Sequence, residues 1–331
     1  MFQTEILLWL QSQASDFWTA FFKFWSGYTE WVIPLMLLIL FAVSLRAGFV
    51  LIQAVFWNMT VVIFLKELIL LPRPSSVDNN VRLLGKGIPN PSPYESGGAK
   101  SFFGRLPRDV VEGVRAHPFD TWGLPSGHTS NSATFGGLLF LLFKRKWVRA
   151  AAIAVIVLVP FSRLYLGRHF LADLLAGYLL SLVFILVFYH GIYCRRWFRD
   201  FFHGRWDRTP WGARTWAILA YLVVLPLAVL LIPYAQIKAV SALLGLNLGY
   251  ILLRIKGLPQ DGGTLLQRLG RAGIALAVYF GLDFLLGAIE GLSPSPGSDI
   301  VLFAHGTLVM MLMFWASTEV SIRLGFFKRP E

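Results

Sequence analysis

A histidine and an aspartate four residues apart, His169 and Asp173, point to nucleophilic chemistry in this chain. Residues at i and i+4 share one face of a helix, so the carboxylate can hold the imidazole in one tautomer and stabilise its cation. Ser162 and Arg163 come shortly before, and the planar Arg163 guanidinium matches the oxygens of a phosphate. The pattern predicts a nucleophile beside a phosphate-binding cation. The alternative is a His–Asp pair that only stabilises the start of a helix.

A second group, Pro125-Ser126-Gly127-His128, opens an apolar segment. Ser126 is a favourable N-cap, and the free N–H groups at a helix start bind anions. Gly127 has no side chain to block a close approach to the backbone. His128 is then placed to protonate a leaving oxygen. The alternative is a capping turn with an incidental histidine.

A third group consists of Lys66 and Arg73, which are seven residues apart. This spacing is about two helical turns, so both side chains can face the same way. Pro72 and Pro74 end the helix there. The pair is either part of a phosphate site or two cations that extend from a helix end toward water.

The composition indicates that these groups sit in a membrane protein. Of 331 residues, 56% are hydrophobic and 15% are charged, against roughly 25% charged residues in ordinary soluble domains. We expect an all-α, polytopic membrane helical bundle of about nine transmembrane helices, since each apolar segment approaches the length of a span. Residues 1–30 mix aromatic and polar side chains, which favours an interfacial helix over a tenth span. The predicted spans are 31–45, 47–71, 126–143, 147–166, 169–190, 215–233, 237–253, 272–289 and 300–322.

The charges predict the orientation. One set of connections carries 18 basic and 4 acidic residues, and the alternate set carries 9 basic and 10 acidic residues. The first set comprises Arg46, 144–149, 194–214, 254–271 and 323–331, and the second comprises 1–30, 72–125, 234–238 and 290–299. Lys and Arg accumulate on the cytoplasmic side, so all three groups are expected on the outer face. We expect an integral protein of a bacterial inner membrane, with its active site facing the periplasm or exterior.

The net charge of +12 is therefore attributed to topology and not to nucleic-acid binding. The basic, aromatic stretch 194–214 is expected to contact anionic lipids. The expected partners are membrane lipids and a lipid phosphate substrate. The single cysteine, Cys194, excludes an internal disulfide and a multi-cysteine metal site.

Together the three groups resemble the type 2 phosphatidic acid phosphatase superfamily of membrane lipid phosphatases. The family pattern K-x6-RP, PSGH and SR-x5-H-x3-D is matched in order and spacing, over roughly residues 31–190. The resemblance implies a phosphatase without metal or other cofactor that works through a phosphohistidine. It implies that His169 attacks phosphorus, Asp173 orients it and His128 protonates the leaving group. The residues implied to bind phosphate oxygens are Lys66, Arg73, Ser126, Gly127 and Arg163.

The resemblance leaves the substrate and the C-terminal part open. Undecaprenyl pyrophosphate, phosphatidic acid and phosphatidylglycerol phosphate are the candidate substrates. The alternatives are a lipid phosphotransferase using the same site and a lipid transporter with a phosphatase-like module. We predict a catalytic membrane domain over 1–193, a basic cytoplasmic linker over 194–214 and a four-helix membrane module of unknown role over 215–331.

Overall fold

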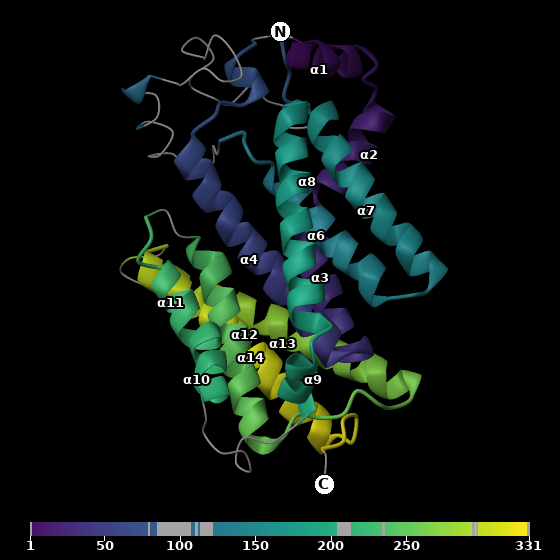
Figure 1. Cartoon of the computed structure of the whole chain (residues 1–331), viewed down its shortest axis with the longest axis vertical. Helices are drawn as coiled ribbons and strands as arrows, with labels where there is room; N and C mark the ends of the chain where they lie inside the picture. Colours follow the sequence, from purple (N-terminus) through teal and green to yellow (C-terminus); the bar gives the residue numbers. More distant parts are fainter. Residues whose placement is uncertain are drawn as a thin grey trace. The chain divides into compact units, whose positions relative to one another are not determined.

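The computed structural model describes residues 2–78, 80–84, 107–109, 112, 122–203, 213–233, 236–292, 295 and 297–329. Within these ranges the chain is helical, with no strand and one isolated bridge between Gln260 and Lys328. Most of the loop 72–125 and the centre of the linker 194–214 lie outside the described residues. The all-helical class is therefore as predicted (Figure 1).

The helices follow the apolar segments of the sequence. In chain order they are α1 (Phe2–Ser12), α2 (Asp16–Ser26), α3 (Tyr28–Leu38), the π-helix η1 (Ile39–Val43), α4 (Leu45–Ile69), the 3₁₀ turn η2 (Pro74–Ser76), α6 (Gly127–Leu142), α7 (Lys146–Tyr165), α8 (Leu171–Ile185), the π-helix η3 (Leu186–Tyr193), α9 (Arg196–His203), α10 (Ala213–Leu219), the π-helix η5 (Ala220–Val224), α11 (Leu225–Val229), α12 (Ile237–Lys256), α13 (Leu265–Gly291) and α14 (Asp299–Arg323).

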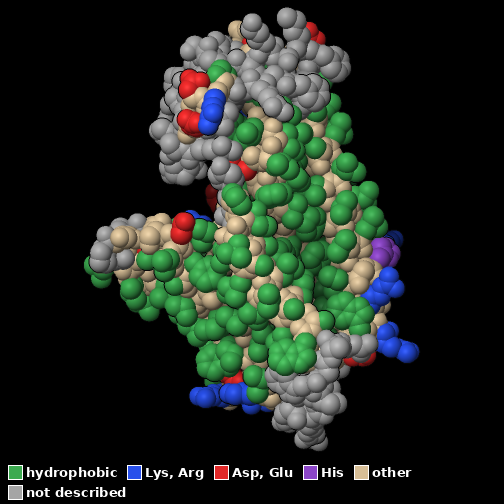
Figure 2. Space-filling model, turned by 60° about the vertical axis from the view of Figure 1, so that its left-hand side comes forward, with side chains coloured by type: hydrophobic (Ala, Val, Ile, Leu, Met, Phe, Trp, Pro, Cys, Tyr) green, Lys and Arg blue, Asp and Glu red, His purple; other side chains and the backbone are tan. Residues whose placement is uncertain are grey.

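Six of the described helices are long and apolar enough to cross a membrane. A seventh span arises if Asp16–Ser26 and Tyr28–Val43, which meet at a bend of 46°, count as one. The predicted spans 126–143 and 215–233 correspond to shorter apolar helices, Gly127–Leu142 and Thr215–Val229. Hydrophobic side chains cover most of the described surface in the view of Figure 2. A membrane-helix protein is confirmed, and the predicted count of nine spans is not.

The chain divides into two compact units. Unit 1 comprises residues 1–31 and 61–186, and unit 2 comprises residues 32–60 and 187–331. All the residues of the three sequence motifs lie in unit 1. The proposed functional boundaries at 193 and 214 stay a prediction.

Unit 1 is built on the close packing of α6 against α7 and α8 (Figure 1). Small residues permit this approach. A Cβ atom at Gly136 would lie 2.9 Å from the carbonyl oxygen of Ala152 on α7, and one at Gly177 on α8 would lie 2.9 Å from that of Ser126. The start of α6 is thereby held against the first turns of α8.

The N-terminal helices of unit 1 also support the motif region. Leu7 of α1 and Phe22 of α2 belong to a buried cluster with Leu164, Tyr165 and other residues at the junction of α7 and α8. Phe22 and Tyr165 rings lie 4.6 Å apart between centroids. The expectation of an interfacial helix over 1–30 stays a prediction, although this segment packs against the helices that carry the motifs.

In unit 2, α12 packs along α14, and α13 packs against α14. Several charged residues in these helices are paired. His305 of α14 lies 3.0 Å from Glu290 and 3.2 Å from Asp283, both on α13. Glu319 pairs with Lys256 at 3.7 Å. These contacts join neighbouring helices, which accounts for charged groups inside apolar segments.

Candidate active site

The His169 and Asp173 side chains form a buried pair at the junction of α7 and α8. Nδ1 of His169 lies 3.1 Å from Oδ2 of Asp173, and the two side chains are 2% and 0% exposed. The same Oδ2 atom accepts the backbone N–H of Phe170 at 3.0 Å. Because Nδ1 faces the carboxylate, Nε2 is the ring nitrogen left for reaction with a substrate. The two side chains are paired as predicted, but not on one helix face: His169 precedes α8, and Asp173 in the first turn reaches back to it.

A tight turn delivers His169 to this position. Gly167 has a φ of +72°, a backbone conformation that favours glycine. A side chain at this position would also collide with the carbonyl group of Arg82 and with the Gln11 side chain. Gln11 and Arg82 are joined by three hydrogen bonds, of 2.7, 3.0 and 3.4 Å, so the turn is enclosed by fixed groups.

The electrostatic environment keeps the His169 ring neutral. Burial lowers the pKa of His169 well below its ordinary value, and the nearby charges of Arg73, Lys66, Arg163 and His128 lower it further. Desolvation and like charge both disfavour an imidazolium. A neutral imidazole retains the lone pair that a nucleophile needs. Three of these residues, Arg73, Lys66 and Arg163, are the predicted phosphate-binding cations, so they lie close enough to the His169 ring to act on its pKa.

The start of α6 is attached to the first turn of α8. The backbone N–H of Ser126 donates to the carbonyl group of Asp173 at 3.0 Å. The Ser126 side chain caps α6, with its Oγ atom accepting from the Thr129 backbone and hydroxyl. Gly127 and His128 follow as the first residues of α6, where backbone N–H groups have no partner within the helix. This geometry provides N–H donors and an imidazole at the start of the helix that packs against α8.

Lys66 is buried at the end of α4 and is held by the chain that leads into α6. Its Nζ atom donates to the carbonyl groups of Trp122 and Gly123, the latter at 3.2 Å. The neighbouring Glu67 accepts the indole N–H of Trp122 at 3.1 Å. Gly123 donates its N–H to the carbonyl group of Leu71 at 2.8 Å. Lys66 therefore also positions the backbone that precedes the Pro-Ser-Gly-His sequence.

The two arginines are oriented by hydrogen bonds. Arg163 is buried in the last turn of α7 and donates to the hydroxyl group of Ser26, the last residue of α2. Arg73 donates to the carbonyl group of Arg168 at 3.5 Å. The Nε atom of Arg163 and the Oδ1 atom of Asp173 are buried without a hydrogen-bond partner among the described residues. Polar atoms left in this way are typical of a site that a ligand completes.

The structure thus gathers the eight predicted site residues within unit 1, and it adds others. Ser26 contacts Arg163, and its backbone lies against the His128 ring. Trp122 and Gly123 fix Lys66. No sequence signal singles out Ser26, because it is more than one hundred residues from the groups that it contacts.

Comparison with known proteins identifies the part of the chain that carries this geometry. Residues 37–197 match the model of the PAP2 superfamily. The predicted resemblance to this superfamily is thereby confirmed over this segment.

Two relatives, both named lipid A 4′-phosphatase, match parts of the chain. A lipid A 4′-phosphatase of Bacteroides thetaiotaomicron is 26% identical over 174 residues, which cover 53% of this chain and 69% of the relative. A lipid A 4′-phosphatase of Porphyromonas gingivalis is 31% identical over 75 residues, which cover 23% of this chain and 32% of the relative. The chain therefore spans about a third of the length of one relative and about two thirds of the other. No solved structure matches.

Proposed function

We propose that this chain is an integral-membrane lipid phosphatase that hydrolyses a phosphate or pyrophosphate group through a phosphohistidine at His169. The observation that carries the proposal is the buried His169–Asp173 pair, which leaves Nε2 of a neutral imidazole among the cations of a PAP2 segment. A nucleophile held by an orienting carboxylate is the arrangement that covalent catalysis requires.

The first step forms a bond between Nε2 of His169 and phosphorus and breaks the bond from phosphorus to the leaving oxygen. That oxygen takes a proton from His128, and the lipid product departs. Asp173 stabilises the positive charge that the His169 ring acquires, since its Oδ2 atom faces Nδ1 at 3.1 Å. A general acid of this type contributes about 10²- to 10⁴-fold to the rate.

The second step releases phosphate. A water molecule attacks phosphorus, gives a proton to His128 and displaces Nε2 of His169, so that both histidines return to their starting states. Lys66, Arg73 and Arg163 bind the phosphoryl oxygens, together with Ser126 and the N–H groups of Gly127 and His128. Fixed donors and cations aimed at the charge of the transition state supply much of the catalysis in such sites.

We assign the substrate to the class of lipids with a terminal phosphate or pyrophosphate. The names of both relatives support a phosphorylated glycolipid of the lipid A type, and the three candidates from the sequence remain in the same class. The charge pattern supports a site on the outer face of a bacterial inner membrane.

The test is phosphate release by the purified full chain in detergent with a chelator present. The substrates are lipid A 4′-phosphate, undecaprenyl pyrophosphate, phosphatidic acid and phosphatidylglycerol phosphate. We expect turnover of at least one, loss of turnover in His169→Ala, and retained turnover in the matched control His190→Ala. Radiolabelled phosphate from the substrate should be trapped on wild-type protein and not on His169→Ala. Turnover that survives His169→Ala overturns the mechanism.

A further inference from the structure

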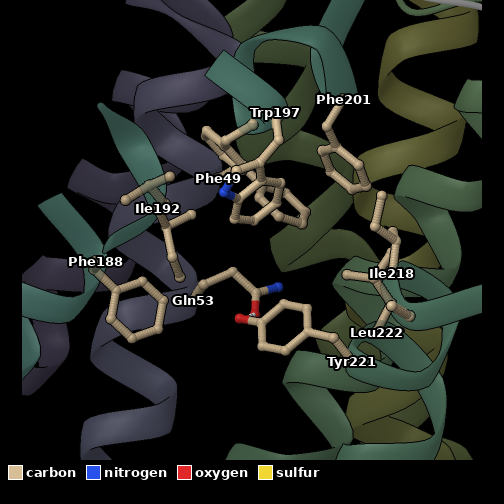
Figure 3. A pocket seen from close by; sticks show the side chains of 12 residues that line it. Phe49, Gln53, Phe188, Ile192, Trp197, Phe201, Ile218, Tyr221 and Leu222 are labelled. Atoms are coloured by element: carbon tan, nitrogen blue, oxygen red, sulfur yellow. Dashed lines mark hydrogen bonds between the residues drawn. The ribbon is translucent and has the colours of Figure 1, made fainter. Parts of the chain in front are cut away.

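Unit 2 contains a cavity of about 480 Å³ that the phosphatase chemistry does not use. Side chains from α4, η3, α9, α10 and η5 point into it (Figure 3). Its wall is mainly aromatic and aliphatic, with Phe49, Phe188, Trp197, Phe201, Ile218 and Leu222 among the lining residues.

The cavity offers a ligand little to hydrogen-bond. Gln53 accepts the Tyr221 hydroxyl at 3.1 Å (Figure 3). It also donates to Asn247. Asn247 in turn donates to the carbonyl group of Leu222 at 2.8 Å. Since these groups bond to one another, the interior suits an apolar chain and not a polar solute.

Ring stacking and a hydrogen bond hold the aromatic residues of the wall in place. Phe201 of α9 stacks on Tyr250 of α12 with ring centroids 4.6 Å apart, and the Tyr250 hydroxyl donates to the Phe201 carbonyl group at 2.7 Å. Phe198 stacks on Phe201 at 5.9 Å. These contacts fix α9 in place, so the cavity does not depend on a loosely attached helix.

Positive charge lies on the same elements. Arg196 and Arg199 are exposed residues of α9, the helix that also supplies Trp197 and Phe201 to the wall. Arg46 precedes Phe49 by one turn at the start of α4, and its guanidinium lies 4.3 Å from the centroid of the Tyr193 ring. The helices that line this apolar cavity thus also carry Arg46, Arg196 and Arg199, against one exposed acid, Asp200 of α9. An apolar chain and a negative charge in one molecule match these helices, and an anionic membrane phospholipid has both.

We propose that unit 2 binds an anionic phospholipid, with an acyl chain in this cavity and its phosphodiester headgroup beside Arg46, Arg196 and Arg199. The bound lipid is distinct from a substrate, because a phosphodiester such as phosphatidylglycerol carries no terminal phosphate. The site lies on the segment 194–203, which the charge pattern assigns to the cytoplasmic leaflet.

The test uses native mass spectrometry of the full chain, exchanged in detergent against an equal mixture of phosphatidylglycerol and phosphatidylcholine. We expect one retained phosphatidylglycerol, preferred over phosphatidylcholine. Arg46→Gln and Arg199→Gln should each weaken retention by about five-fold, the scale of one basic residue at a membrane surface. Arg323→Gln, which removes an exposed arginine of unit 2 outside the cavity, is the matched control and should retain the lipid.

Two variants address the cavity itself. Ala217→Trp places a large side chain at an exposed position of the lining, and Ile218→Trp places one at the half-buried position beside it. Each should abolish retention, and thermal unfolding identifies the variants that remain folded. Equal retention of the two lipids by wild type overturns the proposal, as does undiminished retention by a folded cavity variant. Neither result bears on phosphate release, so the two proposals are tested separately.

Discussion

Nδ1 of His169 faces Oδ2 of Asp173 at 3.1 Å, and this same oxygen holds the backbone N–H of Phe170 at 3.0 Å. One carboxylate oxygen therefore fixes both the orientation of the imidazole and the start of α8. The backbone carbonyl group of Asp173 accepts from Ser126, the N-cap of α6, so the residue also connects the turn that carries His169 with the helix that carries His128.

Asp173→Asn should show whether Asp173 orients the His169 ring for catalysis or only supports the fold. The amide removes the negative charge that stabilises the His169 cation and favours the wrong tautomer, so kcat should fall by about 10³- to 10⁴-fold, as in other carboxylate–histidine pairs. The backbone link to Ser126 is unchanged. Steady-state kinetics should show this loss with thermal unfolding close to that of wild type. A variant with more than a tenth of wild-type kcat would contradict the assigned role.

The ionisation of His169 should be visible by NMR of histidine-labelled protein without substrate. Burial and the neighbouring cations lower the pKa of His169, so its resonance should titrate below about 6.5, the ordinary value for histidine. Arg73→Gln removes one of these charges and should move the titration upward. Arg108→Gln removes an exposed arginine that is not among the charges acting on His169, so it is the control. A resonance that titrates at or above the ordinary value contradicts this prediction.

The lowered pKa of His169 also makes the stability of the fold depend on pH. Below about pH 6.5 the unfolded chain takes up a proton at His169, and the folded protein does not until the pH is lower. The unfolded state then binds more protons, so the contribution of this residue to stability is present above that pH and is lost as the pH falls. In His169→Gln the free energy of unfolding should depend less on pH in this acidic range, which denaturant titrations at several pH values will measure.

Gly177→Ala should disturb the contact between α6 and α8. An added Cβ atom would lie 2.9 Å from the Ser126 carbonyl oxygen and 3.0 Å from Cβ of Thr129. Overpacking of this kind costs about 1–3 kcal/mol, and a displacement of His128 relative to His169 can reduce kcat by about 10²-fold. Gly191→Ala is the control, because nothing lies within 4 Å of its added Cβ atom. Unfolding and kinetics that match for the two variants would contradict the prediction.

Local spacing was sufficient to predict the parts of the site that lie within one element. His169 and Asp173 are four residues apart and do contact each other, although His169 lies just before α8 and Asp173 reaches it from the first turn of that helix. The start of α6 was predicted from the Ser126 cap, and the helix begins at Gly127. Apolar segments likewise predicted the positions of α4, α7, α8 and the C-terminal helices.

Contacts between distant segments were not predictable in this way. Trp122 binds Lys66 from 56 residues away, and Ser26 binds Arg163 from 137 residues away. Such contacts arise from tertiary packing and have no period in the sequence. The π-helical turns η1, η3 and η5 were also missed, because hydropathy reports apolar character and not which carbonyl group each N–H bonds.

Ser26→Ala tests the clearest of the contacts that the sequence did not reveal. Ser26 accepts a hydrogen bond from the Arg163 guanidinium, and a hydrogen bond to a charged group contributes about 1.5–3 kcal/mol. Without it, Arg163 should bind the phosphoryl group less well, and kcat/KM should fall by roughly 10- to 100-fold. The loss should be smaller than in Arg163→Ala, because the cation remains.

The matched control is Ser15→Ala, which removes the N-cap at the other end of α2. It weakens the same helix without touching Arg163, so it measures what helix stability alone contributes to the rate. In the double variant Ser26→Ala/Arg163→Ala, the effect of Ser26→Ala should vanish, because the hydroxyl then has no guanidinium to orient. Additive effects in this double-mutant cycle, or equal losses in Ser15→Ala and Ser26→Ala, would show that Ser26 acts only through the packing of α2.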